Sequence, residues 1–191
     1  MKSFPPSFLQ AQRFDQLLAA YERKDYRMAF SGFKKLAEQG QADAQTNLGI
    51  MYDDGRGVPK DEKQAAAWFR KAAVQGQTDA QTNLGMMYAC GIGMSKDEQQ
   101  AVAWFRKAAE QGQAMAQGAL GAMYAVGRGV PKDEQMAYFW LLLASAQGDK
   151  NAAKIRDLAE RDLSPEQRAA AQASARNWKP KTAAQSSNAT R

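Results

Sequence analysis

Apolar residues recur along most of this chain in two alternating patterns, and both patterns repeat every 36 residues. In the first pattern, apolar positions stand four residues apart, as at Ala44, Leu48 and Tyr52. In the second, they follow the spacing i, i+3, i+4, i+7, i+8. Each spacing places apolar side chains along one stripe of an α-helix. The chain is therefore predicted to form paired helices. The second helix of one pair is expected to bury Ala65, Trp68, Phe69, Ala72 and Ala73.

The period is marked by landmark residues that keep their positions from one unit to the next. They are Gly40, Gly76, Gly112 and Gly148; Leu48, Leu84 and Leu120; Tyr52, Tyr88 and Tyr124; and Trp68, Trp104 and Trp140. A repeat of about 20–50 residues is typical of a solenoid, in which each unit packs only on its neighbours. We predict an all-α solenoid of antiparallel helix pairs. Its units lie near 8–41, 42–77, 78–113 and 114–149.

A glycine-rich turn joins the two helices of each pair. In the unit that begins at residue 42, the turn Gly55–Pro59 contains glycines that permit positive φ and a proline that disfavours helix before it. Asp61 and Glu62 then place negative charge in the first turn of the second helix, where it complements the helix dipole. This helix is predicted to end with Gly76 as a left-handed cap. Gly49 is expected where a neighbouring helix approaches closely.

The C-terminal part departs from the repeat. Earlier units have Lys or Arg at two positions where the last unit has Leu142 and Leu143. Because a solenoid needs its last apolar face covered, we predict that these leucines are buried beneath a helical cap formed by residues 150–178. Residues 1–7 are predicted to be a flexible N-terminus. Residues 179–191 are predicted to be a disordered tail.

The cap is predicted to contain two helices, near 149–162 and 165–177. The start signal of the second consists of Ser164 as N-cap, Pro165 at the first helical position and Gln167 two residues further on. Trp178 is expected to fold back on the cap.

The amino-acid composition removes most enzyme chemistry. The chain has no histidine, so it lacks the commonest general base, the commonest metal ligand and every Ser-His or Cys-His nucleophile pair. Its single cysteine, Cys90, can form neither an intramolecular disulfide nor a cysteine-rich zinc site. We therefore predict a non-enzymatic protein with no catalytic residues, no cofactor and no metal.

Three short motifs suggest chemistry, and each has a simpler explanation. Ser31-Gly32-Phe33-Lys34 matches the S-x-x-K motif of penicillin-recognising enzymes, but neither S-D-N nor K-T-G accompanies it. The Gly-x-Gly pairs, such as 55/57, lack the preceding strand of a phosphate loop. The carboxylates Asp53-Asp54 and Asp61-Glu62 could bind a hard cation, but loop solvation and helix-end charge account for them. A hydrolase that uses Ser31 and Lys34 stays as an alternative.

The formal net charge of +6 raises the question of an anionic partner. The basic residues are not interleaved with aromatic ones as in a platform for single-stranded nucleic acid, so we favour a solvated surface over a nucleic-acid site. No stretch approaches the ~18 apolar residues of a membrane span. The first residues lack the apolar core of a secretory signal. We expect a monomeric, cytoplasmic protein, or a periplasmic or secreted one if a signal peptide has been removed.

Residues 80–112 carry a specific family pattern. It reads Ala80-Gln81-x-Asn83-Leu84-Gly85-x-x-Tyr88-x-x-Gly91-x-Gly93, then Lys96-Asp97, then Ala101-x-x-Trp104-Phe105-x-Lys107-Ala108-Ala109-x-Gln111-Gly112. This pattern resembles the Sel-1-like repeat of bacterial type, a relative of the tetratricopeptide repeat, and the resemblance covers about four fifths of the chain. It implies a right-handed superhelix of antiparallel helix pairs that serves as an adaptor or scaffold for other proteins.

The resemblance also implies where a partner binds. In tetratricopeptide repeats, partners commonly lie in the concave groove lined by the first helix of each pair, and an Asn before the Leu-Gly step can clamp the partner's backbone. Asn47 and Asn83 match that position, whereas the third unit has Ala119. The residues expected in the groove are Thr46, Asn47, Ile50, Asp53, Thr82, Asn83 and Met86. Such a surface suits an extended or helical peptide with apolar side chains. In the alternative, each Asn bonds only to a neighbouring helix or loop.

A second, basic surface is predicted on the second helices of the pairs. Its residues are Lys34, Lys35, Arg70, Lys71, Arg106 and Lys107. These rows could attract an acidic protein or nucleic acid, but we favour the role of keeping an outer face soluble. The sequence thus predicts an adaptor that binds a protein or peptide partner in the concave groove.

Overall fold

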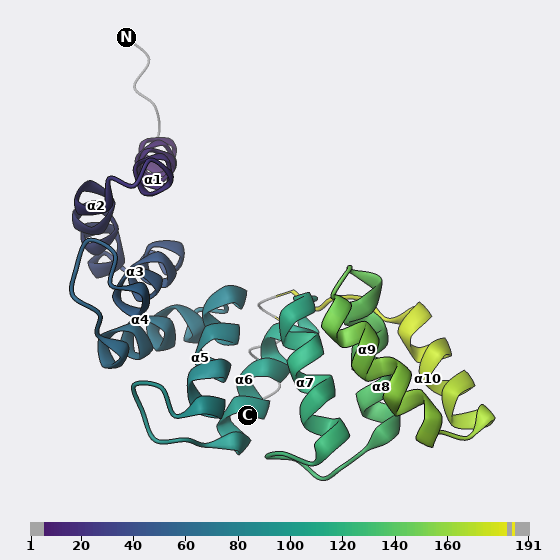
Figure 1. Ribbon diagram of the computed structural model, residues 1–191. Helices are drawn as coiled ribbons and strands as arrows, with labels where there is room; N and C mark the ends of the chain where they lie inside the picture. Colours follow the sequence, from purple (N-terminus) through teal and green to yellow (C-terminus); the bar gives the residue numbers. More distant parts are fainter. Residues whose placement is uncertain (1–5, 183–184, 186–191) are drawn as a thin grey trace. The chain divides into compact units, whose positions relative to one another are not determined.

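The computed structural model describes residues 6–182 and 185, and these residues form α-helices and one short 3-10 helix, with no strand among them (Figure 1). The chain divides into two compact units, Met1–Gln77 and Thr78–Arg191. The predicted flexible N-terminus falls mostly outside the described residues, because helix α1 begins at Pro6.

The first unit contains two helix pairs. Its helices are α1 (Pro6–Glu22), α2 (Tyr26–Glu38), α3 (Ala42–Asp54) and α4 (Glu62–Val74). Phe33, Leu48 and Met51 are among the fully buried side chains of its core.

The second unit continues the same order of helices. It consists of α5 (Thr78–Cys90), α6 (Glu98–Glu110), α7 (Ala114–Val126), α8 (Glu134–Ala146), α9 (Lys150–Ala159), the 3-10 helix η1 (Glu160–Asp162) and α10 (Pro165–Asn177). Its core includes Leu120 and Leu141, both fully buried. The predicted all-α solenoid of antiparallel helix pairs with a helical cap is confirmed.

The helices of each pair approach closely at a glycine. A Cβ atom on Gly49 would lie 2.7 Å from Cε1 of Phe69, and one on Gly121 would lie 2.7 Å from Cγ of Leu141. Because real Cβ contacts are not this short, only glycine fits without a shift of the neighbouring side chain. The close approach predicted at Gly49 is confirmed.

The helix ends follow the predicted signals. Asp61 caps α4, because its Oδ1 accepts a hydrogen bond from the Gln64 amide at 3.0 Å. Gly76 follows the C-cap of the same helix with φ +93°, which confirms the predicted left-handed cap. Carboxylates at these N-termini satisfy amides that have no partner inside the helix.

The recurring tryptophans correct one part of the predicted core. Trp140 is buried, but Trp68 and Trp104 are only half-buried. The Lys71 ammonium lies 3.8 Å from the ring centroid of Trp68, and Lys107 occupies the same place over Trp104 at 4.6 Å. Each of these two tryptophan rings therefore makes a cation–π contact with a lysine at the surface.

The C-terminal cap forms as two helices, and the start signal predicted for α10 is confirmed. Ser164 and Gln167 make a capping box, and Pro165 is the first helical residue. Leu142 and Leu143 are half-buried rather than buried, because they line an open groove of about 390 Å³ between α8 and α10. The cap thus covers the apolar end of the second unit only in part.

The chain after α10 turns back along the second unit. The Trp178 and Trp140 rings meet edge to face with centroids 6.4 Å apart, as expected for a residue that folds back. The Lys181 amide donates to the Glu110 carbonyl at 2.8 Å, although the sequence places a disordered tail from residue 179 onward. Residues 183–184 and 186–191 of that predicted tail lie outside the described residues.

Candidate protein-binding surface

In the first unit, α3 carries the residues predicted to line a groove. Asn47, Ile50 and Asp53 are all half-buried. The Asn47 side chain donates from Nδ2 to the Asp43 carbonyl of its own helix, at 2.8 Å. Its amide therefore bonds within α3, and a partner's backbone would have to displace this hydrogen bond.

Asp53 is the ionisable residue of this face. Partial burial raises the pKa of its carboxyl group, the nearby Asp54 and Glu62 carboxylates raise it further, and Lys60 opposes them. Desolvation disfavours the charged form of an acid, which is the direction observed. Asp54 itself pairs with Arg56 at 3.3 Å, and Glu62 pairs with Lys60 at 3.0 Å.

Two residues predicted to line the groove are buried instead. Thr46 and Thr82 are nearly inaccessible to solvent. The Thr46 hydroxyl donates to the Ala42 carbonyl at 3.0 Å, and the Thr82 hydroxyl bonds to the Thr78 carbonyl at 3.2 Å and to Gln113. The prediction that these threonines line an accessible groove is therefore wrong, because both side chains are buried and their hydroxyls bond to carbonyls of their own helices.

In the second unit, the equivalent face becomes progressively apolar. Asn83 is half-buried and Met86 is 39% exposed, so both can reach a partner. On α7 and α9 the position of Asn83 is taken by Ala119 and Ile155. The position of Met86 is taken by Ala122 and Leu158.

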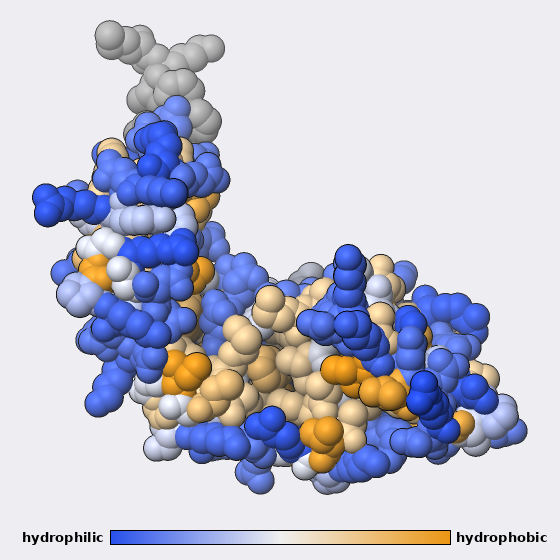
Figure 2. All heavy atoms as spheres, viewed as in Figure 1, coloured by the Kyte–Doolittle hydropathy of each residue, from blue (hydrophilic) through white to orange (hydrophobic). Residues whose placement is uncertain are grey.

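These side chains form one surface, which we call the apolar patch. It consists of Met86, Met115, Ala119, Ala122, Val126, Ile155 and Leu158. Figure 2 shows apolar surface gathered over α7 and extending toward α9, with a hollow at its centre. The members of this patch on α7 and α9 were not predicted from the sequence. The sequence does carry a signal for them: Met86, Ala122 and Leu158 stand 36 residues apart, so the repeat register continues into the helical cap.

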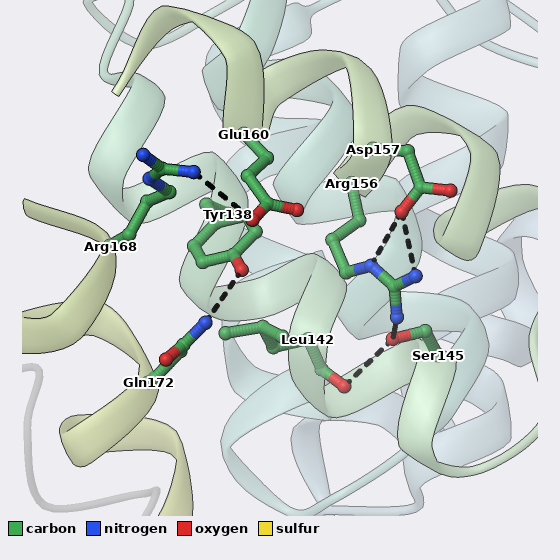
Figure 3. A network of polar contacts seen from close by, with 8 residues as sticks. All are labelled: Tyr138, Leu142, Ser145, Arg156, Asp157, Glu160, Arg168 and Gln172. Atoms are coloured by element: carbon green, nitrogen blue, oxygen red, sulfur yellow. Dashed lines mark hydrogen bonds and ion pairs between the residues drawn. The ribbon is translucent and has the colours of Figure 1, made fainter. Parts of the chain in front are cut away.

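Helix α9 is held against α8 by a polar network that includes the cap (Figure 3). Arg156 donates from Nη1 to the Ser145 hydroxyl at 3.1 Å and pairs with Asp157 at 2.7 Å. Beside it, the Gln172 amide of α10 donates to the Tyr138 hydroxyl at 3.1 Å. The Arg156–Ser145 bond therefore ties α9, the helix that presents Leu158, to α8, and the Gln172–Tyr138 bond ties α10 to the same helix.

A buried glutamine recurs in the first helices α3, α5 and α7 and was not predicted. Gln45, Gln81 and Gln117 occupy equivalent positions and are nearly inaccessible. Gln117 donates to the Ala109 carbonyl at 3.1 Å and accepts from the Gln147 amide at 2.8 Å. Its recurrence at the 36-residue interval was a signal in the sequence, because a polar residue inside a core needs a specific partner.

The predicted basic surface is partly engaged by other side chains. Lys34 and Lys35 are exposed on α2, whereas Lys71 and Lys107 lie over tryptophan rings. The Arg106 guanidinium donates to the Tyr124 hydroxyl at 2.6 Å, and Arg70 is exposed on α4. A binding role for these six residues stays a prediction.

The remaining chemical candidates have structural partners. The Ser31 hydroxyl donates to the Met28 carbonyl at 3.0 Å rather than to Lys34. No group of three or more His, Cys, Asp or Glu side chains in the described part of the chain is arranged to hold a metal ion. Among the same residues, no helix combines the length and apolar character needed to cross a bilayer.

The fold and this surface define a helical repeat protein whose first helices present a partly apolar face. The chain belongs to the Sel1 repeat family, which matches residues 42–77, 78–113 and 114–149. This match confirms the resemblance to the Sel-1-like repeat. Sel1 repeat proteins are generally protein–protein interaction scaffolds and are generally non-enzymatic.

Two solved structures are similar to this chain. One is c5321, a protective antigen of uropathogenic Escherichia coli that displays an SLR fold, with 40% identity and a TM-score of 0.74 over 84% of this chain. The other is a Sel1 repeat protein from Oxalobacter formigenes, with 37% identity and a TM-score of 0.71 over 75% of this chain. The chain spans 34% and 59% of the length of these two structures, respectively. No curated protein matches it.

Proposed function

We propose that this protein is a non-enzymatic adaptor that binds a peptide or protein partner through the face of its first helices. The observation that carries the proposal is the recurrence of accessible apolar side chains at one position of the repeat, as at Ile50, Met86 and Leu158. Apolar side chains that a repeat leaves exposed at a regular interval mark a surface for a partner rather than for solvent. The accessible members of the predicted groove are Asn47, Ile50, Asp53, Asn83 and Met86.

The test compares proteins captured by the tagged full chain and by two double variants. One variant, Asn47→Ala with Ile50→Glu, alters the first unit, and the other, Asn83→Ala with Met86→Glu, alters the second. We expect at least one variant to lose a partner that the wild type captures. Met28→Glu is the control, because Met28 is exposed on α2 and lies off this face.

Circular dichroism establishes that each variant is folded before capture is compared. If the wild type and both variants capture the same proteins in the same amounts, the proposal is wrong. Recognition would then have to use another surface, such as the basic one.

A further inference from the structure

The apolar patch concentrates most of the exposed large apolar side chains in the described part of the chain. Met86, Met115, Val126 and Leu158 are 39%, 57%, 65% and 57% exposed. Of the described large apolar residues that are exposed, only Met28 and Val74 lie elsewhere, both in the first unit. A contiguous apolar surface on a folded protein marks an interaction site.

We propose that the apolar patch binds an amphipathic helix of a protein partner whose apolar stripe is flanked by acidic residues. This inference rests on the proposed function and specifies the partner for the second unit.

The form of the partner follows from the hydrogen-bonding groups that the patch lacks. Ala119 and Ile155 replace the asparagine at the position of Asn83, so they offer nothing to the backbone of an extended peptide. Burying peptide N–H and C=O groups without partners is costly. A helix satisfies these groups internally and presents only side chains. The patch therefore fits a helix better than a strand.

The dimensions of the patch also match a short helix. Met115 and Val126 are the exposed ends of the stripe on α7, and with Ala119 and Ala122 they follow the spacing i, i+4, i+7, i+11. At 1.5 Å per residue the stripe is about 16 Å long, which equals about three turns of a partner helix. The methionines can adapt to different apolar side chains, as in other helix-binding surfaces.

The charge of the partner follows from three basic residues of α9 and η1, which we call the basic edge. Lys150, Lys154 and Arg161 are exposed, and the ion pairs found among the described residues include none of them. Lys154 lies one helical turn from Leu158, so this basic edge borders the patch.

Most carboxylates near this edge already have partners. Asp149 caps α9, Asp157 pairs with Arg156, and Glu160 lies 3.5 Å from Arg168. The hydrogen bond to Glu134 raises the pKa of Lys132, and the Asp162 carboxylate adds to the same rise. The basic edge is therefore complementary to acidic residues on a partner.

The test titrates the full-length protein with three labelled 16-residue peptides. The first has leucines at i, i+4, i+7 and i+11 and glutamates on one flank of the helix. The second has lysine in place of each glutamate, and the third has the first sequence with two central prolines. We expect the first peptide to bind at least ~10-fold more tightly than either other peptide and to gain helical circular dichroism on binding.

A matched pair of variants locates the site. Val126 and Val74 are each 65% exposed and each is the last residue of its helix, so Val126→Glu and Val74→Glu make the same change on and off the patch. We expect Val126→Glu to weaken binding of the first peptide at least ~10-fold and Val74→Glu to change it less than ~2-fold. Lys154→Glu should abolish the preference for glutamate over lysine. Leu158→Glu, with Met28→Glu as control, repeats the comparison at a second position.

Several results would overturn the inference. They are equal affinity for the first two peptides, equal or tighter binding of the proline peptide, and equal effects of the two valine variants. A wild-type dimer that Val126→Glu dissociates would assign the patch to a second copy of this chain and would also overturn it. If captured partners are lost only with Asn47→Ala and Ile50→Glu, the proposed function stands and this inference fails. If no variant changes capture, the proposed function fails whatever the peptides do.

Discussion

At the scale of single residues, two glycines of the loop before α8 have nearly the same backbone conformation but different surroundings. Gly127 has φ +72° and Gly129 has φ +65°, a region that L-residues with side chains adopt only at a cost. A Cβ on Gly127 would lie 3.3 Å from both the Cβ and the backbone nitrogen of Lys132, a tight contact within the same loop. A Cβ on Gly129 would lie 2.2 Å from the Glu98 carbonyl oxygen. Only the second contact requires the backbone of a neighbouring repeat to move.

The two alanine variants should therefore differ in stability. We expect Gly127→Ala to lower the free energy of unfolding by about 1–2 kcal/mol, which is mainly the cost of the left-handed conformation. Gly129→Ala should lower it by about 2–5 kcal/mol, because steric overlap adds to the same strain. Urea denaturation of both variants measures the difference. Equal losses would mean that the loop moves away from α6 at little cost.

At the scale of elements, the buried glutamine of α7 connects helices on both sides of it. Gln117 is fully buried and bonds to the end of α6 through the Ala109 carbonyl. Its Oε1 accepts from Gln147, which is exposed and follows α8 as its C-cap. The Gln117 acceptor therefore depends on the exposed residue Gln147. If that donor is lost, the buried oxygen cannot form a replacement hydrogen bond with water.

This arrangement predicts an unusual cost for a surface substitution. We expect Gln147→Ala to lower the free energy of unfolding by about 1–3 kcal/mol, the cost of an unsatisfied buried acceptor. Gln99→Ala, which alters an exposed glutamine of α6, should change it by less than about 0.5 kcal/mol. In a Gln117→Leu background the effect of Gln147→Ala should fall close to zero, because no acceptor is left. A full effect in that background would show that Gln147 acts through other contacts.

The elements themselves could be predicted from the sequence because their signals are local and recur. Helix α10 begins at Pro165 behind the Ser164 cap, and α4 is followed by Gly76 in the left-handed conformation, both as expected. The burial of Trp68 could not be predicted, because the 3.6-residue period marks a stripe without giving its width. The ring lies at the edge of that stripe, where Lys71 covers it.

At the scale of the whole molecule, the candidate site could be predicted only in part. The repeat register identified the first-helix face and the accessible Asn83 and Met86. It also placed Thr82 on that face, although the side chain is buried and bonds to Gln113, the N-cap residue of α7. Burial of this kind depends on how repeats stack, which a pattern within one helix does not contain. Ile155 and Leu158 of the apolar patch keep the 36-residue register, but the rest of the α9 sequence departs from the repeat and conceals it.

The segment after α10 joins parts of the second unit that are far apart in sequence. Trp178 packs on Trp140 of α8, and Pro180 lies near the Gly112 turn. Lys181 reaches Glu110, 71 residues away, through an ion pair of 3.0 Å. Because α10 covers α8 only in part, this segment is a second attachment for the cap.

The attachment predicts how the cap responds when Trp178 is removed. We expect Trp178→Ala to lower the free energy of unfolding by about 1–3 kcal/mol, less than for a fully buried tryptophan because the ring is half-buried. Amide hydrogen exchange should become faster in α10, whereas exchange in α3 of the first unit should not change. Lys179→Ala is the matched control, since Lys179 is exposed in the same segment. If α10 exchanges at the wild-type rate in Trp178→Ala, the cap is held by its contacts with α8 alone, and the returning segment adds nothing to its stability.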